Sequence, residues 1–298
     1  MTYVILDLEW NGAYSKKCNG YFNEIIEIGA VRLTESGEIV ARFDAFIRPV
    51  VSRKLTKLVT DLTGITDQQI EDGMTFTQAM SRLKSFVGAD KAVLMTWSTT
   101  DLLVLMENCR YFFGDDHIPV FSAYLDLQAY AQQRQQLGTG QQVALAKFAE
   151  LLGLSSEGME LHHAIDDSVL ASKIFSRVYE RDSFEKIMTP IDEEFHRRMS
   201  FRPFYISDID SPLIRRGDLQ FSCEHCGRNL KRISNWKFYN RSFTATFRCA
   251  VCDVAFVGRV QAKRKYEGVE LKKRLVRKQP AEKNLQESQE KEPHSAQA

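Results

Sequence analysis

The chain has 298 residues, of which 44% are hydrophobic and 27% are charged. These proportions are typical of a soluble globular protein, and at ~100 to 200 residues per domain the length suits one large domain and one smaller one. No apolar run approaches the ~20 residues of a membrane-spanning helix, and the first residues lack the basic and apolar segments of a secretory signal. We therefore expect a cytoplasmic protein that does not enter a membrane.

The net charge of +1 is the sum of an acidic N-terminal part and a basic C-terminal part of the chain. Residues 1–200 contain 20 Lys and Arg against 28 Asp and Glu, a net charge of −8. Residues 221–278 contain 15 against 4, a net charge of +11. A basic segment of this kind favours contact with a polyanion.

Two carboxylates stand at the end of the first predicted strand, residues 1–11. Asp7 and Glu9 are two positions apart, so they project from the same face of that strand. Neighbouring carboxylates are costly unless a cation lies between them, which makes this pair the start of a divalent-metal site. The alternative is a strand end with two solvated acids. Strands at residues 24–33 and 39–47 follow closely enough to form an antiparallel meander.

After Pro49 the pattern changes to helices that alternate with short apolar runs. A capping box at Thr66 and Gln69 begins a short helix. Further elements are predicted in chain order: a helix at 75–86, a strand at 92–96, a helix at 101–106, a strand at 124–129, and helices at 143–152 and 164–181. This order predicts an α/β domain with a mixed sheet and helices on both faces.

Five chemically active side chains fall at strand ends or helix starts: Asp7, Glu9, Asp101, His162 and Asp167. Each alone has an ordinary explanation, because a first-turn aspartate favours the helix dipole and a loop histidine is usually solvated. Together, in this order, they resemble the three motifs of the DEDDh family of 3′-to-5′ exonucleases, which includes RNase T and the polymerase proofreading subunits.

The motifs match residue by residue. Asp7-Leu8-Glu9 matches Asp-x-Glu, and His162 and Asp167 have the spacing of His-x-x-x-x-Asp, which leaves His163 and Asp166 out of register. Residues 97–101 match Trp-Gly-x-x-Asp, with Ser98 in place of the glycine. Four further segments resemble the branch that trims small RNAs and ribosomal RNA ends and the bacterial sporulation-inhibitor exonucleases: residues 24–27, 46–49, 62–66 and 162–168.

The resemblance implies a ribonuclease-H-like domain over residues 1–182 that holds two Mg²⁺ or Mn²⁺ ions about 4 Å apart. Asp7 would bridge both ions. Glu9 and Asp167 would hold the ion that activates water, and Asp101 would support the other. His162 would be the general base, and the product would be a nucleoside 5′-monophosphate.

The same resemblance places the terminal nucleotide against residues near the first two motifs: Leu8, Trp10, Asn11 and Trp97. Trp10 suits stacking on a base, although a tryptophan after a strand is also a common core residue.

Cysteines mark a second module at residues 220–265. Two Cys-x-x-Cys pairs separated by 22 residues predict one structural Zn²⁺ site in a zinc ribbon, with Cys223, Cys226, Cys249 and Cys252 as ligands. Strands are expected at residues 236–239, 243–248 and 256–263. Cys18 and Cys109 are isolated and are expected to be reduced thiols in or near the core.

The ribbon interleaves basic and aromatic residues, which suits single-stranded nucleic acid. The cations expected to contact it include Lys237, Arg241, Lys263 and Arg264. The alternative is that the aromatics fill the ribbon core while the charges keep it soluble. Residues 183–219 are expected to be a connector, and residues 266–298 a basic and then disordered tail.

We therefore expect a metal-dependent 3′-to-5′ exonuclease acting on single-stranded nucleic acid, with RNA slightly favoured over DNA. Two alternatives stay open. The chain would be a nucleic-acid-binding or regulatory protein with little turnover, or the ribbon would recruit a protein partner. The oligomeric state is not predicted.

Overall fold

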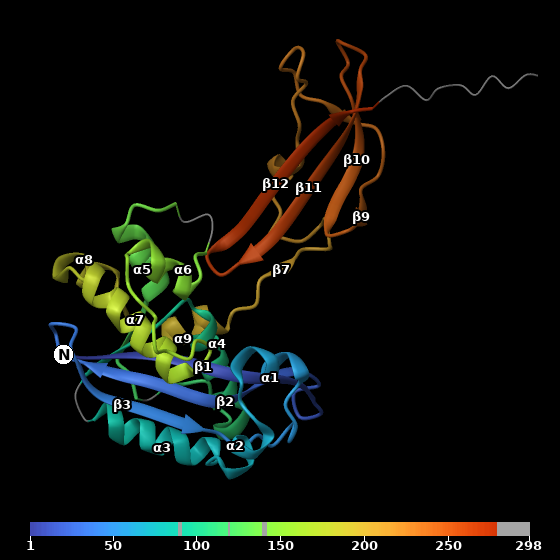
Figure 1. Ribbon diagram of the computed structural model, residues 1–298. Helices are drawn as coiled ribbons and strands as arrows, with labels where there is room; N and C mark the ends of the chain where they lie inside the picture. Colours follow the sequence, from blue (N-terminus) through green and yellow to red (C-terminus); the bar gives the residue numbers. More distant parts are fainter. Residues whose placement is uncertain (89–90, 119, 139–141, 279–298) are drawn as a thin grey trace, which may run out of the picture. The chain divides into compact units, whose positions relative to one another are not determined.

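The computed structural model describes residues 1–88, 91–118, 120–138 and 142–278. They cluster into two compact units, Met1–Ser200 and the chain from Phe201 onward (Figure 1). No helix in these ranges is long and apolar enough to cross a membrane.

A mixed sheet forms the centre of the first unit, as predicted. Its strands are β1 (Thr2–Ser15), β2 (Gly20–Leu33), β3 (Ile39–Phe46), β4 (Ala92–Thr96), β5 (Ala123–Asp126) and β6 (Thr189–Pro190), in the spatial order β3-β2-β1-β4-β5-β6. The meander of β1 to β3 is antiparallel, while β4 and β5 run parallel to β1 and to each other. All five residues of β4 are buried, which is typical of a central strand.

Helices cover both faces of this sheet. They are α1 (Lys57–Thr63), α2 (Asp67–Asp72), α3 (Phe76–Val87), α4 (Thr100–Phe113), α5 (Leu127–Arg134), α6 (Leu145–Leu151), α7 (Ala164–Val178), α8 (Arg181–Ile187) and α9 (Glu193–Ser200). The predicted capping box at Thr66 and Gln69 opens α2, and a second box at Thr75 and Gln78 opens α3.

The alternation of β1 assigns its residues to the two faces. Val4 and Leu6 join a core with α3, α4 and Phe195 of α9, whereas Tyr3 and Ile5 join a core with α5 to α8. Because side chains alternate along a strand, Asp7 and Glu9 continue the face of Tyr3 and Ile5. They therefore stand on the side that α7 covers.

Several boundaries differ from those predicted. The strand expected at 124–129 ends at Asp126, because that side chain accepts a hydrogen bond from the Ala129 amide (2.9 Å) and caps α5. The long helix ends at Val178 rather than 181, and α8 follows as a separate helix. The first part of the expected connector contributes α8, β6 and α9 to the first unit.

The second unit is an antiparallel β module. It contains β7 (Phe204–Tyr205), the 3₁₀ helix η1 (Arg216–Leu219), β8 (Lys231–Arg232), β9 (Lys237–Tyr239), β10 (Ser242–Arg248), β11 (Ala255–Lys265) and β12 (Gly268–Arg277). The three predicted ribbon strands correspond to β9, β10 and β11. Asn240 and Arg241 form the β9–β10 turn at positive φ, as suits a tight hairpin.

The basic segment expected to begin the tail is instead β12, which pairs with β11 along its length. Leu271 and Leu275 of β12 pack against the core of this module. These two leucines give the strand an apolar face, which is hard to recognise in a sequence dominated by charged residues. The disordered end predicted for the tail lies outside the described residues, which stop at residue 278. Cys109 is buried as expected, whereas Cys18 is exposed, contrary to the prediction.

Candidate active site

The close approach of α7 to β2 positions the site. Gly29 is the β2 residue opposite Asp7, and a Cβ atom built on it would lie 2.1 Å from the carbonyl carbon of Ala164. Only glycine permits this contact between a strand and the first turn of a helix. The Ser168 hydroxyl, one turn later, donates a hydrogen bond to the Gly29 carbonyl (3.0 Å). The start of α7 is therefore held directly over the acidic end of β1.

A buried carboxylate, Glu27, fixes the same helix start. It lies opposite Glu9 in the β1–β2 ladder and is fully buried. Its Oε2 accepts a hydrogen bond from the Ala164 amide (3.1 Å), and its Oε1 lies 3.3 Å from His163 Nδ1. The sequence did not predict this role. The sequence offered two signals for this residue: Glu27 belongs to the apolar second strand, where a carboxylate is unusual, and to residues 24–27, which resemble the RNA-trimming branch.

His162 lies two residues before the first residue of α7 and is exposed, with a positive φ of 69°. One ligand atom each from Glu9, His162 and Asp167 lie within 4.8 Å of one another. His163 turns instead to Glu27, in agreement with its place outside the motif register. The structure thus brings two of the predicted acids and the predicted base together.

Asp101 joins the site from α4. It is 5% exposed, and its Oδ1 accepts a hydrogen bond from the Leu8 amide (3.2 Å) between the two acids of β1. The turn before it has Ser98 at a φ of 81°, the left-handed conformation that glycine adopts freely. The serine therefore keeps the tight turn of the motif. Its hydroxyl supports this turn by accepting a hydrogen bond from the Thr100 amide (3.2 Å).

The carboxylates shift one another's protonation. Burial, followed by the charges of Asp101 and Asp167, raises the pKa of Asp7 well above its usual range. Burial and the neighbouring Glu27 raise the pKa of Glu9 to about 8, and burial raises that of Asp101 to about 7. Burial also raises the pKa of Asp167. Such a concentration of buried acids fits bound divalent cations, whose charge reverses these shifts.

The residues predicted to bind the terminal nucleotide lie close to this site. Most of their side chains, however, are buried or hydrogen-bonded within the protein. Leu8 is 2% exposed and Asn11 is 1% exposed. Asn11 donates to the Lys54 carbonyl (3.1 Å) and accepts from the Thr56 amide (3.1 Å), which ties β1 to the loop before α1.

The two tryptophans are also packed. Trp97 donates from Nε1 to the Val143 carbonyl (3.1 Å) and packs edge-on against Phe148, so it is part of the core. Trp10 is half-buried against the core that contains α3 and α4, which agrees with the core alternative for this residue.

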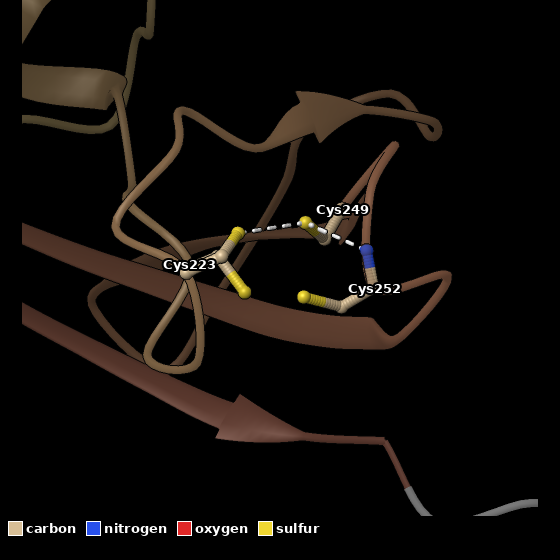
Figure 2. A group of neighbouring side chains, drawn as sticks. Cys223, Cys249 and Cys252 are labelled. Atoms are coloured by element: carbon tan, nitrogen blue, oxygen red, sulfur yellow. Dashed lines mark hydrogen bonds between the residues drawn. The ribbon is translucent and has the colours of Figure 1, made fainter.

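The four predicted zinc ligands converge in the second unit. One sulfur from each of Cys223, Cys226, Cys249 and Cys252 lie within 4.8 Å of one another. Figure 2 shows Cys223, Cys249 and Cys252 turned toward a common centre. Amide groups of residues 251 and 252 stabilise the Cys249 thiolate and lower its pKa to about 6, which suits a metal ligand.

Two equivalent turns present these cysteines. Gly227 follows the second cysteine of the first pair at a φ of 70°, and Asp253 follows that of the second pair at 50°. The amides of Cys223 and Cys249 donate to the carbonyls of Arg228 (2.8 Å) and Val254 (3.0 Å), which closes each turn. The donor set and its two matching turns fit one tetrahedral metal ion.

The predicted basic contacts lie on the β module. Lys237 and Arg241 are exposed, while Lys263 and Arg264 are half-buried. The Arg241 and Lys263 cations lie 5.3 and 5.6 Å from the ring centre of Tyr205. The aromatics divide between core and surface. Phe247 is buried against Trp236, whereas two others are exposed, Phe238 and Tyr239.

Sequence comparisons identify relatives of the first unit. The RNase_T family model, described as an exonuclease, matches residues 4–175. A Bacillus subtilis protein named "Probable 3'-5' exonuclease KapD" is 32% identical over 180 residues, which are 59% of this chain and 83% of that protein. The protein "ERI1 exoribonuclease 2" of Xenopus laevis is 29% identical over 257 residues, which are 76% of this chain but only 35% of that protein.

Solved structures show the same fold. The nuclease domain of 3'hExo, described as a DEDDh family member bound to rAMP, aligns over 59% of this chain and 90% of its own, with a TM-score of 0.52 and 24% identity. Cell-death related nuclease 4 (CRN-4) aligns over 76% of this chain and 86% of its own, with a TM-score of 0.51 and 19% identity. The ribonuclease-H-like architecture is therefore shared.

Proposed function

The chain belongs to the RNase T family of 3′-5′ exonucleases, and from this premise we propose that it shortens single-stranded nucleic acid from the 3′ end and prefers RNA to DNA. The observation that carries the proposal is the meeting of Glu9, Asp167 and His162 at one point, beside Asp7 and Asp101. The RNA preference is supported by the match to the Xenopus exoribonuclease and by the four segments that resemble the RNA-trimming branch.

The family implies divalent metal ions at this site, and an all-oxygen donor set suits Mg²⁺ or Mn²⁺. Asp7 and Asp101 would hold one ion, and Asp7, Glu9 and Asp167 the other. When bound, a pair of such ions activates water and stabilises the leaving oxygen of a phosphodiester.

The oxygen of the attacking water would bond to phosphorus while His162 takes the water's proton on its imidazole and the bond from phosphorus to the preceding nucleotide's 3′ oxygen breaks. That oxygen regains a proton, and a nucleoside 5′-monophosphate leaves. Support comes from the place of His162 at the start of α7, exposed to solvent and within reach of two carboxylates. An imidazole nitrogen with a free lone pair is suited to accepting this proton.

The test uses 5′-labelled RNA and DNA of the same sequence with Mg²⁺ or Mn²⁺. Wild type should produce a ladder that shortens from the 3′ end, faster on RNA, while Asp7→Asn and Asp167→Asn should abolish it. The matched control is Asp166→Asn, because Asp166 lies in the same helical turn but bonds to the Glu160 amide (2.9 Å). Activity of Asp7→Asn within tenfold of wild type would contradict the assignment. Equal rates on both polymers would contradict only the RNA preference.

We further propose that the β module holds one structural Zn²⁺ and helps bind the nucleic acid. The cations near Tyr205 and the exposed Phe238 and Tyr239 support this role, since phosphate contacts and base stacking need both kinds of side chain. Replacing Lys237, Arg241, Lys263 and Arg264 with glutamine should weaken binding and flatten its salt dependence by ~1 in log–log slope per lost phosphate contact. Lys147→Gln, an exposed cation of the first unit, is the control. An unchanged salt slope would favour a protein partner for the module.

A further inference from the structure

A second group of metal-ligating side chains lies in the first unit, outside the candidate active site. Its members come from α9 and from the loop after α4. A hydrogen bond from Arg110 of α4 to Ser200 of α9 (3.1 Å) also links these two parts of the chain. The members of the group are two imidazoles and three carboxylates: Asp115, Asp116, His117, Glu193 and His196. Glu193 and His196 are three residues apart, so they share one face of α9.

The potential ligand atoms are close together. One ligand atom each from Asp116, His117 and His196 lie within 4.8 Å of one another. His196 Nδ1 lies 3.9 Å from Asp116 Oδ1, and His117 Nε2 lies 3.2 Å from Glu193 Oε1. The two imidazole rings are 4.1 Å apart between centres.

His196 supplies an independent indication of a missing ligand. The residue is 6% exposed, and its Nδ1 is buried without a hydrogen-bond partner among the described residues. A buried nitrogen left unpaired costs about 1–3 kcal/mol. The ring is held in this position because the adjacent Phe195 is packed in the core against Tyr124. The nitrogen therefore faces Asp116 at a distance too long for a hydrogen bond.

We propose that this cluster binds one divalent transition-metal ion, with Zn²⁺ the best match to its donors. His117, His196 and Asp116 would be ligands. Glu193 lies outside this group of mutually close ligand atoms, and its side chain, which is 76% exposed, would turn toward the ion to complete a four-coordinate set. Metal–donor bonds of ~2.0–2.2 Å place tetrahedral ligands ~3.3–3.6 Å from one another, and the observed 3.2 and 3.9 Å separations bracket this range. Two imidazoles distinguish this cluster from the all-carboxylate site and favour zinc over magnesium.

The surrounding contacts would orient the ligands. Asp115 contacts Nδ1 of His117, the arrangement by which a carboxylate commonly orients a metal-bound imidazole through its other nitrogen. Arg110 and Ser200 both donate to Asp116 Oδ2, which leaves Oδ1 toward His196. A site with four protein ligands has no open position, so its role would be structural. It would fasten α9 to the loop that leads from α4 toward β5.

The test uses the full-length protein with its cysteine site filled by one equivalent of Zn²⁺ and with excess Mg²⁺ present for the acidic site. Co²⁺ is then titrated while visible absorption and the melting temperature are recorded. One further equivalent should bind with the bands of a four-coordinate nitrogen–oxygen site and should raise the melting temperature. Thiolate charge-transfer bands would reveal any exchange at the cysteines.

Three variants make the result specific. His117→Gln and His196→Gln should each weaken Co²⁺ binding by at least ~10-fold, whereas Glu194→Gln, which removes an exposed carboxylate of α9 that pairs with Arg197 (2.8 Å), should leave it unchanged. His117 is more exposed than His196, so its variant keeps the test valid if His196→Gln fails to fold. No uptake of Co²⁺ by wild type, or equal uptake by His117→Gln, would overturn the proposal and identify the cluster as a metal-free ion-pair network.

Discussion

Gly29 and Ala164 are in direct backbone contact, although 134 residues separate them and one lies in a strand and the other in a helix. This contact sets how far the start of α7 penetrates over the sheet. Because His162 and Asp167 flank Ala164 on the chain, it also sets their distance from the acids of β1.

Replacing Gly29 with alanine should therefore displace α7. The added Cβ would meet backbone atoms at 2.1–2.3 Å, which cannot yield as a flexible side chain would. We expect the free energy of unfolding to fall by about 1–3 kcal/mol. The exonuclease rate should fall by a larger fraction of its wild-type value than the free energy of unfolding does. Gly20→Ala in the same strand is the control, because its nearest contact would be 3.9 Å. Urea unfolding and the labelled-RNA assay measure both effects, and a fully active Gly29→Ala would show that α7 tolerates displacement.

Glu27 should act as a positioning residue for the helix start. Glu27→Ala leaves the buried Ala164 amide unpaired, which should cost about 1–3 kcal/mol and lower the rate at saturating RNA more than it weakens RNA binding. Glu24→Ala is a matched control, since Glu24 is a buried carboxylate of the same strand that accepts from the Val50 and Val51 amides instead. If the two variants lose stability and rate in the same proportion, Glu27 has only a structural role.

Ser98 tests the turn that replaces the motif glycine. An L-residue at a φ of 81° carries strain of about 1–2 kcal/mol, which the hydrogen bonds to Thr100 partly offset. Ser98→Ala keeps the strain and loses these bonds, whereas Ser98→Gly loses both. We expect Ser98→Gly to be more stable than Ser98→Ala by about 1 kcal/mol in urea unfolding. Equal stabilities would mean that the turn is unstrained.

The acidic site should make stability depend on pH when Mg²⁺ and Mn²⁺ are absent. Folding raises the pKa of Glu9 from 4.5 to about 8, so the folded state binds this proton more tightly than the unfolded state. The stabilisation from this group is complete below about pH 4.5 and is lost as pH rises toward 8. Glu9→Gln should flatten the decline between about pH 4.5 and 8 in urea titrations. Added Mg²⁺ should bind more tightly as pH rises, because the proton that it displaces is held less firmly.

The sequence by itself determined the parts of this protein that depend on local periodicity and spacing. Alternation along β1 was enough to place Asp7 and Glu9 on one face, and a capping pattern was enough to start α2 at Asp67. Two Cys-x-x-Cys pairs were sufficient to predict the cysteine cluster, since each pair forms within its own turn.

The tertiary structure decided everything that depends on which distant backbones come together. Glu27 reaches α7 across 137 positions, Asn11 turns into the loop before α1, and His196 meets Asp116 only because α9 contacts the loop after α4. Local pattern cannot report these contacts. A side chain's partner depends on how closely two elements pack and in which register. Here the lack of a side chain at Gly29 sets how closely α7 approaches β2.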